Sequence, residues 1–141
     1  MLDVAAARLR ARGERMTRPR RTVLSALAAQ AGHVTAEELV DAVAAADPRV
    51  HRASVYRSLE TLGALGLVQH IHVSHGPTVY HLVGAVGAHP HAQCRSCGAL
   101  FDLPAGLLDG VARHMRAQAG FVLDGAHVAL SGQCAQCAPP D

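Results

Sequence analysis

The first half of the chain has the hydrophobic periodicity of helices. Apolar side chains recur every three or four positions in four segments, which predicts helices over residues 3–12, 18–30, 36–46 and 51–65. Thr35 followed by Glu38 is typical of a capping box at the start of the third helix. Asp47-Pro48 predicts its end, because the residue before a proline is disfavoured in helical backbone. Four short helices can pack as one small domain.

After Gly66 the pattern changes to short runs that favour strands. Residues 67–73 and 78–82 are such runs, and residues 74–77 between them predict a hairpin turn. Helix, turn, helix and hairpin follow one another in the order of a winged helix-turn-helix domain. In such a domain the second helix of the pair enters the major groove of DNA. We therefore expect the segment 51–65 to be a recognition helix.

A stretch of small residues over 83–88 predicts a domain boundary. We expect a winged-helix DNA-binding domain over 1–83, a hinge over 84–90 and a second domain over 91–141. The pattern of the second domain predicts strands ending at Cys94 and Phe101, a helix over 105–118 and a hairpin around 121–131. The expected fold class is α+β.

Composition and charge narrow the class of protein. Half of the residues are hydrophobic, which supports a packed core, and no apolar run reaches the roughly 20 residues of a membrane span. The N-terminus lacks the apolar segment of a secretory signal, so we expect a cytoplasmic protein. Seven arginines fall between Arg8 and Arg21. Taken alone, this basic segment is more typical of a solvated helix face than of a phosphate-contacting arm.

All four cysteines occur in two identical motifs, Cys94-x-x-Cys97 and Cys134-x-x-Cys137. Two such pairs supply the four thiolates of a tetrahedral, structural zinc site with no open position. Two disulfides are the first alternative, which a cytoplasmic location disfavours. A thioredoxin-like redox pair is the second, but no βαβ pattern surrounds either motif. We predict one structural Zn²⁺ per chain.

Histidines are numerous and partly paired. His70 and His72, like His89 and His91, are separated by one residue in extended runs, so each pair shares one face of a strand. Two imidazoles that close together suit Zn²⁺, Ni²⁺, Cu²⁺ or Fe²⁺. We interpret three further histidines as surface residues: His51, His75 and His114.

Together these residues resemble the ferric uptake regulator (Fur) family of bacterial metal sensors. Four motifs carry the resemblance: residues 15–21, residues 54–59, the HxHxxCxxC run over 89–97, and Cys134 with Cys137. The resemblance implies an N-terminal winged-helix domain and a C-terminal α/β dimerisation domain. It also implies a homodimer that binds a palindromic operator in double-stranded DNA when metal is bound.

The resemblance also implies roles for particular residues. DNA contacts map onto Arg15, Arg18, Ser54, Tyr56 and Arg57, with Arg15 in the minor groove. The four cysteines map onto the structural zinc site. A regulatory metal site at the hinge maps onto His33, His81, His89, His91 and Asp102. A possible second site, similar to that of the nickel-responsive branch, maps onto His70, His72 and His127.

Two departures from the family pattern bear on the regulatory metal. His81 follows Tyr80 where iron sensors usually carry a carboxylate, and residues 86–88 lack the histidines that often precede the HxHxxC run. The first departure makes the ligand set rich in nitrogen, which favours Ni²⁺ or Zn²⁺ over Fe²⁺ or Mn²⁺. The second removes a ligand expected of a nickel site.

The sequence thus predicts a metal-responsive transcriptional repressor of metal uptake and homeostasis genes, with no small-molecule substrate and no membrane partner. An iron-dependent peroxide-sensing repressor of the same fold is the main alternative. A thiol oxidoreductase or a metal hydrolase is more remote, because no catalytic triad or carboxylate pair is present. A zinc-stabilised adaptor that binds only protein would leave the arginine-rich segment and the 51–65 helix unexplained.

Overall fold

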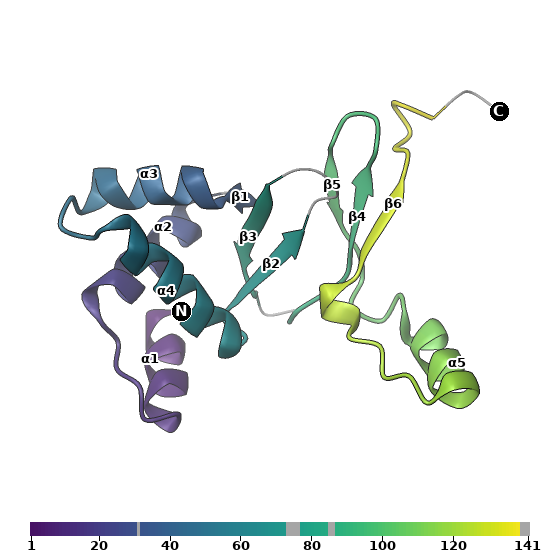
Figure 1. Ribbon diagram of the computed structural model, residues 1–141, viewed down its shortest axis with the longest axis horizontal. Coiled ribbons are helices and arrows are strands. Elements are labelled where there is room, and N and C mark those ends of the chain that lie inside the picture. Colours follow the sequence, from purple (N-terminus) through teal and green to yellow (C-terminus); the bar gives the residue numbers. More distant parts are fainter. Residues whose placement is uncertain (31, 73–76, 85–86, 139–141) are drawn as a thin grey trace. The chain divides into compact units, whose positions relative to one another are not determined.

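The chain folds into two compact units, Met1–Val83 (the first unit) and Gly84–Asp141 (the second unit). The structure is a computed structural model that describes residues 1–30, 32–72, 77–84 and 87–138 (Figure 1). Each unit contains its own three-stranded sheet. Residues 85 and 86 of the predicted hinge lie outside the described residues.

The first unit contains four helices, as the periodicity predicts. They are α1 (Leu2–Ala11), α2 (Arg18–Ala29), α3 (Ala36–Ala46) and α4 (Arg52–Ala64). The Thr17 hydroxyl caps α2 by accepting from the Arg20 N–H, and Pro19 lies in the first turn, where no hydrogen-bond donor is needed. The predicted capping box of α3 is present, with Thr35 and Glu38 hydrogen-bonded reciprocally. Local sequence therefore defines where these helices begin.

Three antiparallel strands complete the first unit, in the order β1-β3-β2. Strands β2 (Val68–His72) and β3 (Thr78–Leu82) form the expected hairpin of a winged helix. The predicted turn over 74–77 lies mostly outside the described residues. Strand β1 (Val34–Thr35) pairs with β3 and was not predicted, because two residues are too few to show alternation.

The core of the first unit is aliphatic. Leu24 of α2, Leu39 of α3 and Leu62 of α4 are fully buried. Helix α4 turns Val55, Leu59 and Leu62 inward, as its periodicity predicts, and so presents its other faces outward. This packing holds α4 firmly at the surface of the unit (Figure 1).

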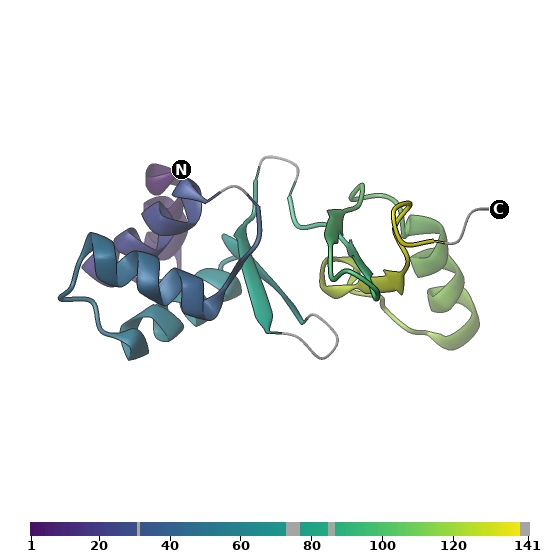
Figure 2. The same cartoon turned by 90° about the horizontal axis from the view of Figure 1, so that it is seen from above.

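The second unit contains a different sheet, in the order β5-β4-β6. Its elements are β4 (His91–Cys94), β5 (Leu100–Asp102), α5 (Asp109–Ala119), a 3₁₀ turn (Gly125–His127) and β6 (Ala129–Gly132). Strand β4 pairs antiparallel with β5 and parallel with β6. Figure 2 shows α5 beside this sheet. The α+β fold class is confirmed.

Two predictions for the second unit need correction. The hairpin around 121–131 is wrong: residues 121–124 form no strand, and β6 pairs with β4 in parallel. A parallel pair requires a crossover, which α5 supplies. The helix predicted over 105–118 begins only at Asp109, after turns at 105–108. In the described part of the chain, no helix is long and apolar enough to cross a membrane.

Candidate metal centres and DNA-binding surface

The parallel pairing of β4 and β6 brings the two cysteine motifs together. Cys94 ends β4 opposite Gly132, and the N–H of Gly98 donates to the Cys94 carbonyl across 2.8 Å to close the first turn. Gly98 has a φ of +76°, a conformation that favours glycine. In the second motif the Cys137 N–H donates to the Cys134 carbonyl at 2.9 Å. Both turns therefore lie at the same end of two adjacent strands.

The four sulfur atoms fit one tetrahedral ion. All of them lie within 4.8 Å of one another, and the sulfurs of Cys97 and Cys134 are 3.8 Å apart. Zn–S bonds of about 2.3 Å in a tetrahedron separate the sulfurs by about 3.8 Å. All four cysteines are free thiols. This donor set suits Zn²⁺, and four thiolates fill its coordination sphere.

Two of the four thiols have pKa values shifted in opposite directions. Hydrogen bonds from the backbone N–H groups, first that of Cys134 at 3.4 Å and then that of Cys97, lower the pKa of Cys94 to about 6. Hydrogen bonds with the neighbouring thiols, that of Cys134 above all, raise the pKa of Cys137 to about 12. Four thiolates this close repel one another, so a cation is needed before all four ionise.

A second set of ligand atoms lies at the start of β4 and the end of β5 in the second unit, with His89 just before β4. His91 pairs in register with Asp102, and the two Nε2 atoms of His91 and His89 lie 3.3 and 3.4 Å from the same Asp102 Oδ1. The donor atoms of these three residues lie within 4.8 Å of one another. His89 Nδ1 lies 3.1 Å from the Gly87 carbonyl, a contact that leaves Nε2 to face Asp102. Two imidazoles and one carboxylate thus converge.

The remaining predicted histidines form two pairs in the first unit and one contact in the second. In the first unit, the rings of His33 and His81 have centroids 4.7 Å apart. His70 and His72 share one side of β2, as predicted, with centroids 5.3 Å apart. His127 lies in the second unit, where its Nδ1 is 2.7 Å from Asp124 Oδ2.

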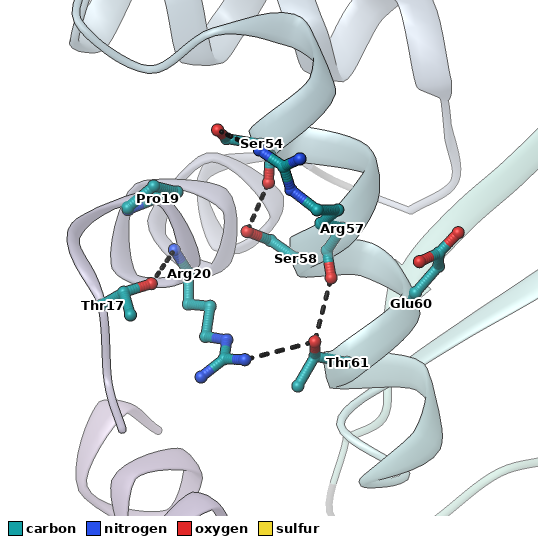
Figure 3. A pocket seen from close by; sticks show the side chains of 8 residues that line it. All are labelled: Thr17, Pro19, Arg20, Ser54, Arg57, Ser58, Glu60 and Thr61. Atoms are coloured by element: carbon teal, nitrogen blue, oxygen red, sulfur yellow. Dashed lines mark hydrogen bonds between the residues drawn. The ribbon is translucent and has the colours of Figure 1, made fainter. Parts of the chain in front are cut away.

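The outward faces of α4 carry three of the predicted DNA contacts. Arg57 donates to the Ser54 hydroxyl at 3.3 Å, and both line a pocket between α4 and the start of α2 (Figure 3). The Tyr56 hydroxyl accepts from Arg52 at 3.3 Å, and the Arg52 guanidinium lies 5.7 Å from the Tyr56 ring centroid. Polar side chains thus cover the surface that a recognition helix would turn toward DNA.

The arginine-rich segment divides into two groups. Arg8 donates to the carbonyls of Leu65 and Gly66 at the end of α4, and Arg18 forms an ion pair with the largely buried Asp47. Arg20 is likewise bound within the first unit. Four others have no side-chain partner among the described residues and face solvent: Arg10, Arg12, Arg15 and Arg21. The predicted contact Arg15 is thus available to DNA, whereas Arg18 already has an anionic partner.

Comparison with known proteins agrees with this geometry. The model of the ferric uptake regulator family matches residues 11–131. The chain belongs to this family. The transcriptional regulator FurA of Mycobacterium tuberculosis is 37% identical over 137 residues, which cover 96% of this chain and 91% of FurA.

Two solved structures of Fur-family proteins are similar. The ferric uptake regulator of Pseudomonas aeruginosa with manganese gives a TM-score of 0.71 at 28% identity, covering 92% of this chain and 96% of that one. A zinc uptake regulator complexed with zinc and DNA gives 0.70 at 27% identity, covering 96% and 91%. Fur-family proteins are metal-responsive transcriptional regulators that bind operator DNA as dimers, and they are not enzymes.

Sequence reasoning missed the residues that hold the predicted DNA contacts of this Fur-family protein. Arg52 binds both Tyr56 and Glu37 of α3, which lowers the pKa of Glu37, chiefly through the hydrogen bond itself. The spacing of Arg52 and Tyr56, four residues apart on one helix, was a usable signal. The pairing of Arg18 with Asp47 joins residues far apart in sequence and left no local signal.

Proposed function

We propose that this Fur-family protein is a cytoplasmic, metal-responsive repressor of metal uptake and homeostasis genes. In this proposal Cys94, Cys97, Cys134 and Cys137 hold a structural Zn²⁺. A second divalent metal is the signal. The observation that carries the proposal is the convergence of His89, His91 and Asp102, whose donor atoms lie within 4.8 Å of one another, separate from the saturated cysteine site.

The regulatory ligand set of the proposal adds His33 and His81 to these three residues. A metal held by residues of both units would restrict their relative motion. To move such an equilibrium from mostly open to mostly closed requires about 5 kcal/mol of differential binding, which several coordinate bonds can supply. Four imidazoles and one carboxylate favour Ni²⁺ or Zn²⁺ over Fe²⁺ or Mn²⁺. His70, His72 and His127 form the proposed second site.

We assign the contacts with DNA, a palindromic operator bound by the homodimer, to five residues: Arg15, Arg18, Ser54, Tyr56 and Arg57. The exposed guanidinium of Arg57 beside Ser54 can reach base edges or phosphates from α4. The exposed side chain of Arg15 can enter the minor groove of the DNA. Arg18 can reach a phosphate only by sharing its guanidinium with Asp47 or by leaving it.

The first experiment is elemental analysis of the chelator-washed, full-length protein. Titration with Ni²⁺, Zn²⁺, Fe²⁺ and Mn²⁺ follows, with binding to the protein's own promoter as the readout. We expect about one tightly held zinc per chain and one further metal that switches DNA binding on. Absence of zinc from unoxidised protein would contradict the cysteine site. DNA binding indifferent to all four metals would contradict the regulatory role.

A pair of matched variants locates the signal. His91→Ala removes a buried ligand and should abolish metal-dependent DNA binding while the zinc content stays near one per chain. His114→Ala changes an exposed histidine on α5 and should leave both measurements unchanged. Equal behaviour of the two variants would contradict the assignment of His91.

A peroxide-sensing repressor is the second candidate, and one observation favours it. The Asp102 carboxylate lies against both His89 and His91, so an iron ion held there would have oxidisable imidazoles as ligands. Treatment of the iron-loaded protein with hydrogen peroxide should then add one oxygen atom to the peptide with His89 and His91, and DNA should be released. An unchanged peptide mass would exclude this mode of sensing.

A further inference from the structure

The segment that carries Arg15 is irregular. Residues 14–17 form neither helix nor strand, and they join the end of α1 to the start of α2. Arg15 itself is exposed, so packing of its own side chain does not place it. A DNA contact on such a segment costs conformational entropy upon binding unless another group holds the backbone in advance.

The Arg20 side chain holds this backbone by hydrogen bonds. The Arg20 guanidinium donates to the Arg15 carbonyl, and its Nη2 also donates to Glu14 Oε2 at 2.9 Å. The same Nη2 donates to the Thr61 hydroxyl of α4 at 3.3 Å. The Arg20 side chain is only 14% exposed. It therefore lies between the segment and the recognition helix.

The contact between Arg20 and Thr61 connects Arg20 to a proposed DNA-binding residue of α4. The Thr61 hydroxyl, which accepts from Arg20, donates to the Arg57 carbonyl at 2.9 Å (Figure 3). This use of the hydroxyl is consistent, because it has one proton to donate and lone pairs to accept with. One hydrogen-bonded chain thus runs from the Arg15 carbonyl through Arg20 and Thr61 to the backbone of Arg57.

We propose that Arg20 is a positioning residue that holds the Arg15 segment against α4, so that Arg15 and Arg57 meet DNA in a set register. Arginine suits this role because its planar fork directs several N–H groups at once, which lysine cannot reproduce. The inference rests on the proposed DNA-binding function, in which Arg15 and Arg57 are contacts.

The test is a double-mutant cycle on the full-length, metal-loaded protein and its own promoter DNA. Arg20→Lys should weaken binding by about five- to ten-fold, within the range of coupling measured in one hydrogen-bond network. In an Arg15→Ala background the same change should weaken binding by less than about two-fold. Equal losses in the two backgrounds would overturn the proposal.

Salt dependence separates positioning from a direct phosphate contact. Arg20→Lys preserves the positive charge, so the slope of log affinity against log salt should not change. Glu14→Ala removes an exposed partner of Arg20 with little risk to folding and should weaken binding in the same direction. Arg21→Lys, at an exposed neighbouring position, is the matched control and should have no effect.

A second readout needs no DNA. Amide hydrogen exchange over residues 12–17 should accelerate in Arg20→Lys and Glu14→Ala but not in Arg21→Lys, because the hold on the segment is lost. Unchanged exchange would overturn the proposal even if DNA binding fell. Failure of the wild-type protein to bind DNA with any metal would instead contradict the proposed function, and the exchange result would still decide whether Arg20 holds the segment.

Discussion

The two units of this protein achieve stability by different means. In the first unit, leucines and valines from three helices enclose a core, and Leu24, Leu39 and Leu62 are fully buried. Among the described residues of the second unit, only Pro90, His91 and Cys94 are buried. Helix α5 buries none of its residues, and several large apolar side chains are exposed: Phe101, Leu107, Val111, Phe121, Val122 and Leu130.

This difference indicates which unit depends on other components. Burial of apolar surface is the main stabilising contribution to a small domain, and the second unit has little of it. Zinc at the cysteine site can replace part of that contribution by joining the ends of β4 and β6. A second copy of the chain can cover exposed apolar side chains, in agreement with the dimeric state of Fur-family proteins. We therefore expect the first unit to fold alone and the second to depend on metal and dimerisation.

Loss of zinc should produce the largest difference in stability between the two units. In Cys97→Ser, zinc content should fall from about one per chain to none and the second unit should unfold, because structural zinc contributes about 10–16 kcal/mol in small domains. Hydrogen exchange should show the first unit still protected. Ser96→Ala in the same turn is the control and should retain zinc. A second unit that stays folded without zinc would refute the contrast.

Matched leucine truncations compare the cores directly. Leu39→Ala should lower the free energy of unfolding of the first unit by about 2–5 kcal/mol, because it creates a cavity in a filled core. Leu107→Ala, at a side chain 51% exposed in the second unit, should change stability by less than about 0.5 kcal/mol at protein concentrations where the chain is monomeric. Both losses of stability are measured by urea titration, with amide hydrogen exchange as the readout of unfolding in each unit. A larger loss for Leu107→Ala that appears only at high concentration would instead identify a dimer contact.

DNA binding should depend on Arg57 in the first unit, and loss of this side chain should not change the zinc content. Arg57→Ala should weaken promoter binding by about 1–3 kcal/mol, the usual cost of one base-contacting arginine, with unchanged zinc content. Fluorescence anisotropy with labelled promoter DNA and elemental analysis measure the two quantities. Arg113→Ala on α5 is the control in the second unit. If Arg113→Ala weakened binding as much as Arg57→Ala, the division of roles between the units would be wrong.

The smallest expected effect concerns the start of α3. Thr35→Ala removes the capping box and should destabilise the first unit by about 1 kcal/mol, without changing the second. Thermal unfolding at neutral pH measures this loss. Ser25→Ala, at an exposed position inside α2, should be nearly neutral by comparison.

The capping-box effect should also depend on pH. Hydrogen bonds from the Thr35 backbone N–H and then its hydroxyl lower the pKa of Glu38 from its usual value of 4.5. A lowered pKa in the folded state means that the stabilisation is present above pH 4.5 and is lost as the pH falls through the folded-state value. The difference between wild type and Thr35→Ala should therefore shrink in acid. A difference that is constant from pH 7 to strongly acidic pH would exclude this carboxylate as its source.

The same contrast explains how much of the structure the sequence could predict. Helical periodicity located α1 to α4 because their apolar residues face a core within the same unit. In the second unit Phe121 and Val122 are exposed, so their apolar character reflects no internal strand, and the predicted hairpin was wrong. Apolar pattern thus predicts secondary structure better where the chain buries its own side chains: the helix α5, which buries none of its residues, was predicted to begin four residues too early.

The candidate sites divide similarly. The spacing of the cysteines and of His89 and His91 predicted sets of ligands that the structure brings close together. The partners of the arginines were beyond prediction, because Arg8 and Arg18 contact residues distant in sequence. The arginine-rich segment therefore looks uniform in sequence, whereas three of its seven arginines are held by contacts within the first unit.

The position of the cysteines has a consequence during synthesis on the ribosome. Cys134 follows Cys94 by 40 residues and becomes its neighbour only when β6 pairs with β4. At about 5–20 residues per second, roughly 2–8 s pass between the synthesis of the two motifs. During this interval the nascent chain carries a completed first unit and an isolated pair of thiols. A site of four thiolates can therefore form only after most of the chain has been made, and until then Cys94 and Cys97 lack the other two ligands of the site.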